Sequence, residues 1–191
     1  MNFRRGKETS KVILKGLLMA GAFTAACSSP YFARRAIPLL SQHIKYKLKE
    51  KKRRQKFYRT FYYLKNRRLI NVRYFGKQIY ISLTPDGRKL AGKYQIDDLN
   101  IKKPKKWDRI WRILIFDIPD KHKIKREALR GKLKELGLYQ LQKSVWVCPY
   151  QFEKEVETLR RFFAFSNQEM KIIIASSIQN DQEVRNFFKL R

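Results

Sequence analysis

Apolar residues recur with two different periods in the second half of the chain. Ile113 to Phe116 form a short unbroken apolar run, which predicts a strand buried on both faces. Leu129, Leu133 and Leu136 follow at spacings of four and three, so they lie on one face of a predicted helix, which Gly137 is placed to end. A core strand followed by an amphipathic helix is the beginning of a layered fold that mixes strands and helices.

The elements that follow complete this unit. Val145 and Val147 alternate with their neighbours at the period of a strand. Later patterns predict a helix with Val156, Leu159, Phe162 and Phe163 on its apolar face, a buried strand over Lys171–Ala175 and a terminal helix over Asp181 to Leu190. The resulting βαββαβ order predicts a ferredoxin-like α+β sandwich over residues 107–191.

The first half of the chain is predicted to begin with two helices. An apolar segment predicts a helix from Ser10 to Ala25, with Ser10 as its N-cap. The residues of this helix that we expect to be buried include Val12, Leu17 and Ala20. A second, shorter helical element is expected around Phe32, Ile37 and Leu40.

The most basic stretch, Lys45 to Arg68, predicts a third helix with two different faces. Phe57, Phe61 and Leu64 are spaced four and three apart and form an apolar stripe that can pack into a core. A polar stripe lies roughly opposite and consists of Lys52, Lys56, Arg59, Tyr63 and Asn66. This helix can therefore pack against its domain while it presents cations and an amide outward.

A hairpin is predicted after the basic helix. Two strand-like runs, Leu69–Tyr74 and Gln78–Leu83, flank a short turn at residues 75–77, and Thr84 and Pro85 then suit the cap and first turn of another helix. This order of elements resembles the winged helix-turn-helix domains of bacterial repressors, here over residues 1–94. Residues 95–106 lack periodicity and are predicted to be a linker.

The charge of the chain is large and unevenly distributed. The sequence holds 45 Lys and Arg against 16 Asp and Glu, a formal net charge of +29. Residues 1–106 hold 28 basic and 5 acidic residues, or +23, whereas residues 107–191 hold 17 and 11, or +6. A segment this basic favours an anionic partner, and nucleic acid and an anionic membrane surface are the two candidate classes.

Double-stranded DNA is the partner that the predicted elements favour. A helix fits the major groove, where Arg, Lys and Asn can pair with base edges. RNA is a less favoured partner, because RNA recognition usually involves unstacked bases on aromatic platforms. No stable membrane association is expected for this folded, aromatic-rich pattern. The residues predicted to contact DNA are Lys52, Arg53, Arg54, Lys56, Arg59, Tyr63 and Asn66 of the basic helix, with Arg73 and Lys77 of the hairpin.

Several motifs of the second domain resemble a known family. These motifs are Phe-Asp-Ile-Pro-Asp at residues 116–120, the Lys/Arg-rich helix after it, Leu-Gly-Leu at 136–138 and Gln-Lys-Ser-Val-Trp at 142–146. They are similar to the ferredoxin-like domain of the small CRISPR-associated adaptation subunit, and more closely to the domain of that type in PaaX-family transcriptional repressors. The resemblance covers roughly Trp107 to Ala175, and it implies a DNA-binding repressor that dimerises through this domain.

The resemblance leaves two roles open for Asp117, which follows the first strand of this domain. In the adaptation subunits the corresponding aspartates of two chains approach each other across the dimer axis. Asp117 would then hold Mg²⁺ or Mn²⁺ in a metal-dependent endonuclease. Alternatively, Asp117 accepts hydrogen bonds from the backbone or from Ser144 and has a structural role. We favour the structural role, and therefore predict a homodimeric transcriptional regulator without catalytic residues or a cofactor, with the nuclease as the alternative.

The amino-terminal segment also imitates a bacterial lipoprotein signal. Basic residues precede an apolar run that ends at Cys27. Lys15 interrupts this run, and Thr24 stands where a larger aliphatic residue is usual, so we favour a first helix instead. The run is also too short to span a bilayer. Cys27 and Cys148 provide neither a disulfide framework nor a metal cluster, which suits a cytoplasmic protein.

Overall fold

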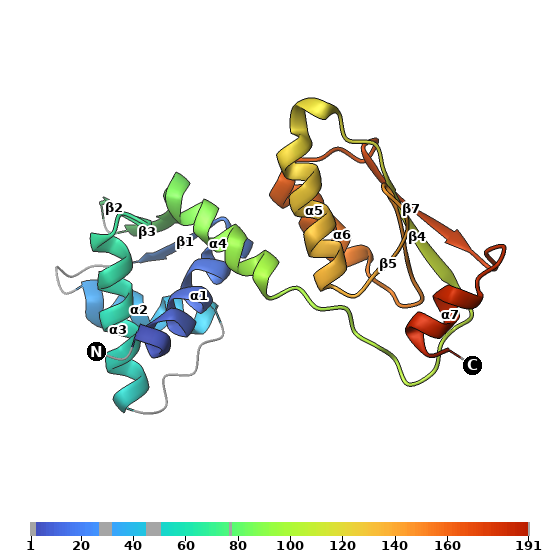
Figure 1. Cartoon of the computed structure of the whole chain (residues 1–191). Helices are drawn as coiled ribbons and strands as arrows, with labels where there is room; N and C mark the ends of the chain where they lie inside the picture. The colour runs from blue at the N-terminus through green and yellow to red at the C-terminus, as the bar shows by residue number, and fades with distance from the viewer. Residues whose placement is uncertain (1–2, 27–31, 45–50, 77, 191) are drawn as a thin grey trace. The chain divides into compact units, whose positions relative to one another are not determined.

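The chain folds into two compact units, residues Met1–Asp97 and Asp98–Arg191. The computed structural model describes residues 3–26, 32–44, 51–76 and 78–190. Each unit has its own antiparallel sheet with helices packed on it, so the chain is α+β (Figure 1). None of the helices in these described ranges combines the length and the apolar composition that a membrane span requires.

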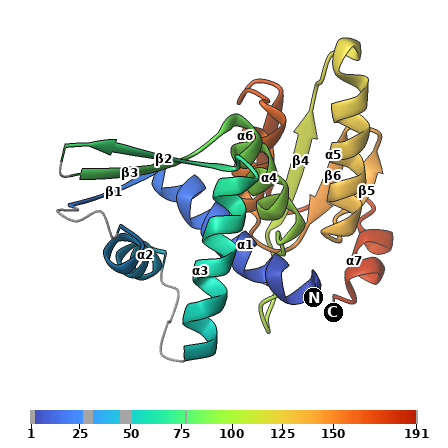
Figure 2. The same cartoon turned by 90° about the vertical axis from the view of Figure 1, so that its left-hand side faces the viewer.

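The first unit contains four helices and a three-stranded sheet within its described residues. Its elements are α1 (Phe3–Ala20), β1 (Ala22–Ala26), α2 (Phe32–His43), α3 (Lys51–Asn66), β2 (Ile70–Phe75), β3 (Gln78–Leu83) and α4 (Pro85–Asp97). The strand order is β1-β3-β2, with antiparallel pairing throughout. Figure 2 shows this sheet as a ribbon that projects to one side of α1 and α3.

The prediction of one helix from Ser10 to Ala25 was wrong at both ends. Helix α1 begins at Phe3, so Ser10 lies inside the helix and is not its N-cap. The helix ends at Ala20 because Gly21 adopts the left-handed conformation, with a φ of 74°. The next residues form β1, which pairs with β3 in the register Ala22↔Ser82. Pairing with β3 thus replaces the intrahelical hydrogen bonds that these residues would have made in a longer helix.

The segment that imitates a lipoprotein signal is part of the folded unit up to the end of β1. Ile13, Leu14 and Leu17 of α1 are fully buried in the core. Val12 is half-buried and Ala20 is exposed, whereas both were predicted to be buried. Cys27, on which the signal interpretation depends, lies outside the described residues.

The junction between β3 and α4 confirms the predicted helix cap at Thr84. The Thr84 hydroxyl accepts a hydrogen bond from the Gly87 backbone N–H at 3.0 Å and donates one to the Arg68 carbonyl at 2.7 Å. These bonds close the hairpin against the start of α4. Helix α4 continues to Asp97, so residues 95–97 of the predicted linker are helical.

The second unit has the predicted strand and helix order. Its elements are β4 (Trp111–Phe116), a single 3₁₀ turn (Asp120–His122), α5 (Lys123–Glu135), β5 (Tyr139–Gln142), β6 (Val145–Cys148), α6 (Glu153–Phe163), β7 (Met170–Ala175) and α7 (Gln182–Phe188). The sheet order is β5-β6-β4-β7, and all neighbours are antiparallel. Figure 1 shows α5 and α6 together on one face of this sheet.

The opposite face of this sheet is covered only in part. Val184 of the short helix α7 packs there against Trp111 and Val147. Ile113 and Ile115 of β4 are half-buried, so β4 is not buried on both faces as predicted. The difference arises because a seven-residue helix covers one end of the sheet face, whereas α5 and α6 cover most of the other. Phe162, predicted to be buried on α6, is 41% exposed.

A buried arginine fixes the chain just before β4. Arg112 is 4% exposed, and its guanidinium donates to Asp108 at 2.6 Å and to the Pro149 carbonyl at 3.1 Å. The hydrogen bond from Arg112 holds the pKa of Asp108 below its ordinary value. An arginine is rarely buried unless a specific partner pairs with it. The sequence patterns indicated neither the burial of Arg112 nor its partners, so this contact was not predicted.

Candidate nucleic-acid interface

Helix α3 has the two faces that its sequence predicts. Phe57, Phe61 and Leu64 are at most 1% exposed and lie in the core of the first unit. Thr60, on the same side, is also buried, and its hydroxyl donates to the Lys56 carbonyl at 2.8 Å, which satisfies it within the helix. Burial of this stripe orients the helix, so the opposite face is directed toward solvent.

The predicted DNA-contacting residues of α3 occupy this outer surface. Lys52, Arg59 and Asn66 are exposed and follow one another at intervals of seven, which keeps them on one side of the helix. Tyr63 is 52% exposed, and Lys56 is half-buried. The cations and the amide are thus available at the surface.

Arg53 and Arg54 differ from the other cations of the helix in their angular position. Both are exposed. Arg53 precedes Phe57 by four residues and therefore lies on the side of the apolar stripe, in the first turn of the helix. It is consequently placed beside the outward face and not on it. Gln55 does lie on the outward face, between Lys52 and Arg59, and is exposed. Sequence reasoning missed it, although glutamine is one of the residues that pair with adenine edges.

The β2–β3 hairpin places further candidate residues at its tip. Arg73 is exposed on β2, whereas Lys77 lies outside the described residues. Tyr74 and Phe75 are 58% and 59% exposed. The Phe75 ring contacts the Tyr80 ring edge-on, with centroids 6.5 Å apart. Sequence reasoning treated Phe75 as part of the turn, and the signal it missed is the presence of two adjacent aromatic residues directly before a turn glycine.

No opposing charge lies on these two elements. Helix α3 holds seven Lys and Arg residues and no Asp or Glu, and the hairpin strands also lack acidic residues. Such a surface attracts polyanions, because fields from neighbouring like charges add. A helix with exposed Lys, Arg, Gln and Asn residues can enter a major groove, while an adjacent hairpin can contact the neighbouring backbone.

Asp117, the candidate metal ligand, is exposed at the end of β4. Its backbone N–H donates to the Glu169 carbonyl at 2.9 Å, which fixes the strand end. The carboxylate receives no hydrogen bond within the described residues, so the predicted bond from Ser144 is not formed. Instead, the Ser144 carbonyl accepts from the Phe116 N–H at 3.1 Å.

The other acids near Asp117 are engaged elsewhere. Asp120 pairs with Arg126 at 2.8 Å. The Glu169 carboxylate accepts a hydrogen bond from the Ser166 backbone N–H at 2.8 Å, and hydrogen bonding from the backbone and the side chain of Ser166 holds the pKa of Glu169 below its ordinary value. No group of three or more His, Cys, Asp or Glu residues in the described ranges could hold a metal ion. One chain therefore offers a single carboxylate here, and the remaining ligands of a Mg²⁺ or Mn²⁺ ion would have to come from water, a substrate phosphate or a second chain.

Comparison with known families identifies one part of the chain. Residues 104–186 match the family model of the PaaX protein central Cas2-like domain. The matched segment contains β4 through α6, β7 and most of α7. No curated protein matches the chain significantly.

Proposed function

We propose that this chain is a PaaX-like transcriptional regulator that binds double-stranded DNA as a homodimer. In this proposal residues 1–97 form a winged helix-turn-helix domain, in which α3 enters the major groove and the β2–β3 hairpin is the wing. The second unit is a ferredoxin-like domain that joins two copies. The family match at residues 104–186 supports this assignment, because it relates the second unit to PaaX proteins.

The observation that carries the proposal is the outward face of α3. This helix follows α2 and precedes the hairpin, and its buried stripe leaves Lys52, Arg59 and Asn66 at the surface. Helix-turn-helix proteins present their second helix to the major groove in the same way. A solvated basic surface without function would not require an amide and aromatic groups among the cations, or an acid-free hairpin beside them.

The sheet face that α7 leaves open supports dimerisation. Ile173 is 45% exposed and pairs across the sheet with the half-buried Ile113, and both lie on the face where α7 packs. Phe187 of α7 is 53% exposed and contacts the Tyr139 ring, with centroids 5.3 Å apart. A two-fold related copy would cover this apolar face and place two α3 helices on inverted half-sites.

The DNA-binding part of the proposal is tested by selection from a pool of genomic duplex fragments, followed by gel-shift measurements on the enriched sequence. We expect retention of an enriched duplex without cleavage in the presence of Mg²⁺ or Mn²⁺. Equal retention of every duplex and of single-stranded RNA would contradict sequence-specific DNA binding. Fragmentation of the DNA would favour the nuclease alternative.

The dimer is tested by light scattering on Ile173→Glu. The matched control is Ile174→Glu, because Ile174 is 58% exposed and the strand alternation directs it to the opposite face. We expect a dimer for the unmodified chain and for the control, and a monomer for Ile173→Glu. A dimer that resists Ile173→Glu but dissociates with Ile174→Glu would assign the interface to the other face.

A further inference from the structure

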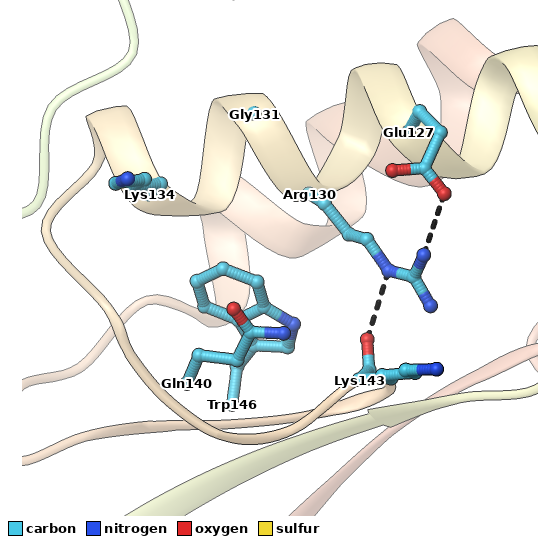
Figure 3. A pocket seen from close by; sticks show the side chains of 7 residues that line it. All are labelled: Glu127, Arg130, Gly131, Lys134, Gln140, Lys143 and Trp146. Carbon is cyan, nitrogen blue, oxygen red and sulfur yellow. Dashed lines mark hydrogen bonds and ion pairs between the residues drawn. The ribbon is translucent and has the colours of Figure 1, made fainter.

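We propose that the groove between α5 and the β5–β6 hairpin binds the phosphate group of a small molecule. The groove is a cavity of about 430 Å³. Its lining residues are Glu127, Arg130, Gly131, Lys134, Gln140, Lys143 and Trp146 (Figure 3). Sites for small ligands have volumes of roughly 300–1,000 Å³, so the groove has room for more than the phosphate itself.

Arg130 is held in position before any ligand arrives. Its Nε donates to the Lys143 carbonyl at 2.9 Å, and its Nη1 donates to the Glu127 carboxylate at 2.5 Å. Figure 3 shows both interactions: the bond to Lys143 ties α5 to the hairpin across the groove, and the pair with Glu127 lies within α5. The Nη2 group makes no hydrogen bond within the described residues and can donate to an oxyanion. An arginine oriented in advance loses little side-chain entropy when it binds such a group.

The charge of the groove matches a phosphate dianion. Three cations, Arg130, Lys134 and Lys143, stand against one acid, Glu127, which leaves a net charge of +2. A phosphate monoester carries about −1.5 to −2 at neutral pH. A carboxylate would neutralise only half of this charge, so the balance favours phosphate.

The floor of the groove holds a polar group that lacks a partner. Trp146 is 2% exposed, and its indole N–H is buried and donates to no acceptor among the described residues. Buried donors are nearly always paired, which makes this N–H a candidate donor to a ligand oxygen. Gln140, on the same wall, has an exposed side chain and can turn aside to admit the anion.

The groove is open beside Gly131, above this floor. A Cβ atom built at Gly131 would have no heavy atom within 4 Å, so the helix is not packed onto the sheet at this point. Glycine costs roughly 0.5–1 kcal/mol relative to alanine inside a helix. The open space beside Gly131 and the cations that line the groove together leave room for an anionic group.

The test follows the indole N–H signal of Trp146 by ¹H–¹⁵N NMR on the full chain. The signal is assigned by its loss in Trp146→Phe, and inorganic phosphate is titrated against sodium chloride of equal ionic strength. We expect a saturable shift with phosphate and none with chloride. Arg130→Gln should weaken the apparent affinity about tenfold or more, because it removes a charge-assisted hydrogen bond.

Arg161→Gln is the matched control, since Arg161 is an exposed arginine of α6 that pairs with Glu157 at 3.0 Å but lies outside the groove. Its phosphate affinity should equal that of the unmodified chain. Lys134→Gln is a second variant. The Lys134 side chain is exposed and makes no hydrogen bond among the described residues, so the fold does not depend on this side chain. Absence of a saturable shift, or equal affinity in Arg130→Gln and the control, would overturn the proposal. A shift with short duplex DNA but none with inorganic phosphate would assign the groove to the DNA backbone and overturn it as well.

Discussion

Removal of charge from the outward face of α3 should change the salt dependence of DNA binding by a predictable amount. Six cations lie on α3 and the hairpin where a duplex can reach them: Lys52, Arg53, Arg54, Lys56, Arg59 and Arg73. If each neutralises one phosphate, the slope of log K against log salt concentration is about −5.4 per chain, at roughly −0.9 per phosphate. A rise from about 50 to about 200 mM salt then lowers the affinity of one chain for one half-site roughly a thousandfold.

The double variant Lys52→Gln, Arg59→Gln removes two of these charges from the outward face. The slope should fall to about −3.6, and the same change in salt should cost about a hundredfold in affinity. Fluorescence anisotropy with a labelled duplex that carries a single half-site, at a series of salt concentrations, measures both quantities.

A control of equal charge separates contact from net charge. Lys89 and Lys93 are exposed on α4, and Lys89→Gln, Lys93→Gln changes the net charge by the same amount. We expect the control to keep a slope close to that of the unmodified chain. If both double variants lower the slope equally, α3 is not the DNA-contacting helix and the attraction is a general property of the basic domain.

Three further predictions concern stability, thiol chemistry and Asp117. Gly87→Ala should destabilise the first unit by roughly 3 kcal/mol in chemical denaturation, because the added Cβ would lie 1.8 Å from the Leu69 carbonyl oxygen. The control Gly131→Ala should be neutral or stabilising, because open space surrounds Gly131. An equal loss of stability in both variants would refute the steric cause. Burial raises the pKa of the Cys148 thiol to about 11, so in a Cys27→Ser background iodoacetamide should label it only on unfolding, and its contribution to the free energy of unfolding should fall as the pH rises from about 9 toward about 11. Rapid labelling of the folded protein near neutral pH would contradict this. Asp117→Ala should leave duplex affinity unchanged, and metal-dependent cleavage that disappears in this variant would establish the nuclease instead.

The elements that local periodicity could predict are those with strong amphipathic or turn signals. The stripe of Phe57, Phe61 and Leu64 fixed both the existence and the orientation of α3, and Thr84 marked the start of α4. Strand β1 could not be recognised in this way. Its sequence, Ala-Phe-Thr-Ala-Ala, is compatible with a helix, and its pairing partner is β3, which lies far along the chain. The available signal was the glycine at position 21, a residue type that commonly ends helices.

The two candidate sites differ in how far they could be predicted from the sequence. The cations of α3 are visible as a stripe, because one element carries them. The groove beside Trp146 lies between α5 and the β5–β6 hairpin, so its lining comes from segments that are separate in the sequence. No sequence pattern predicts that Arg130 donates a hydrogen bond to the Lys143 carbonyl. Such a site becomes visible only when the packing of the helix on the sheet is known.

Because β1 pairs along one side of β3, a recombinant protein that starts at Cys27 would lack both that strand and the helix α1, which contributes to the core. The backbone N–H and C=O groups of β3 would then form an open edge, which invites pairing with strands of other molecules. Truncation at the apparent signal-cleavage position should therefore give aggregated protein and not a trimmed, functional domain.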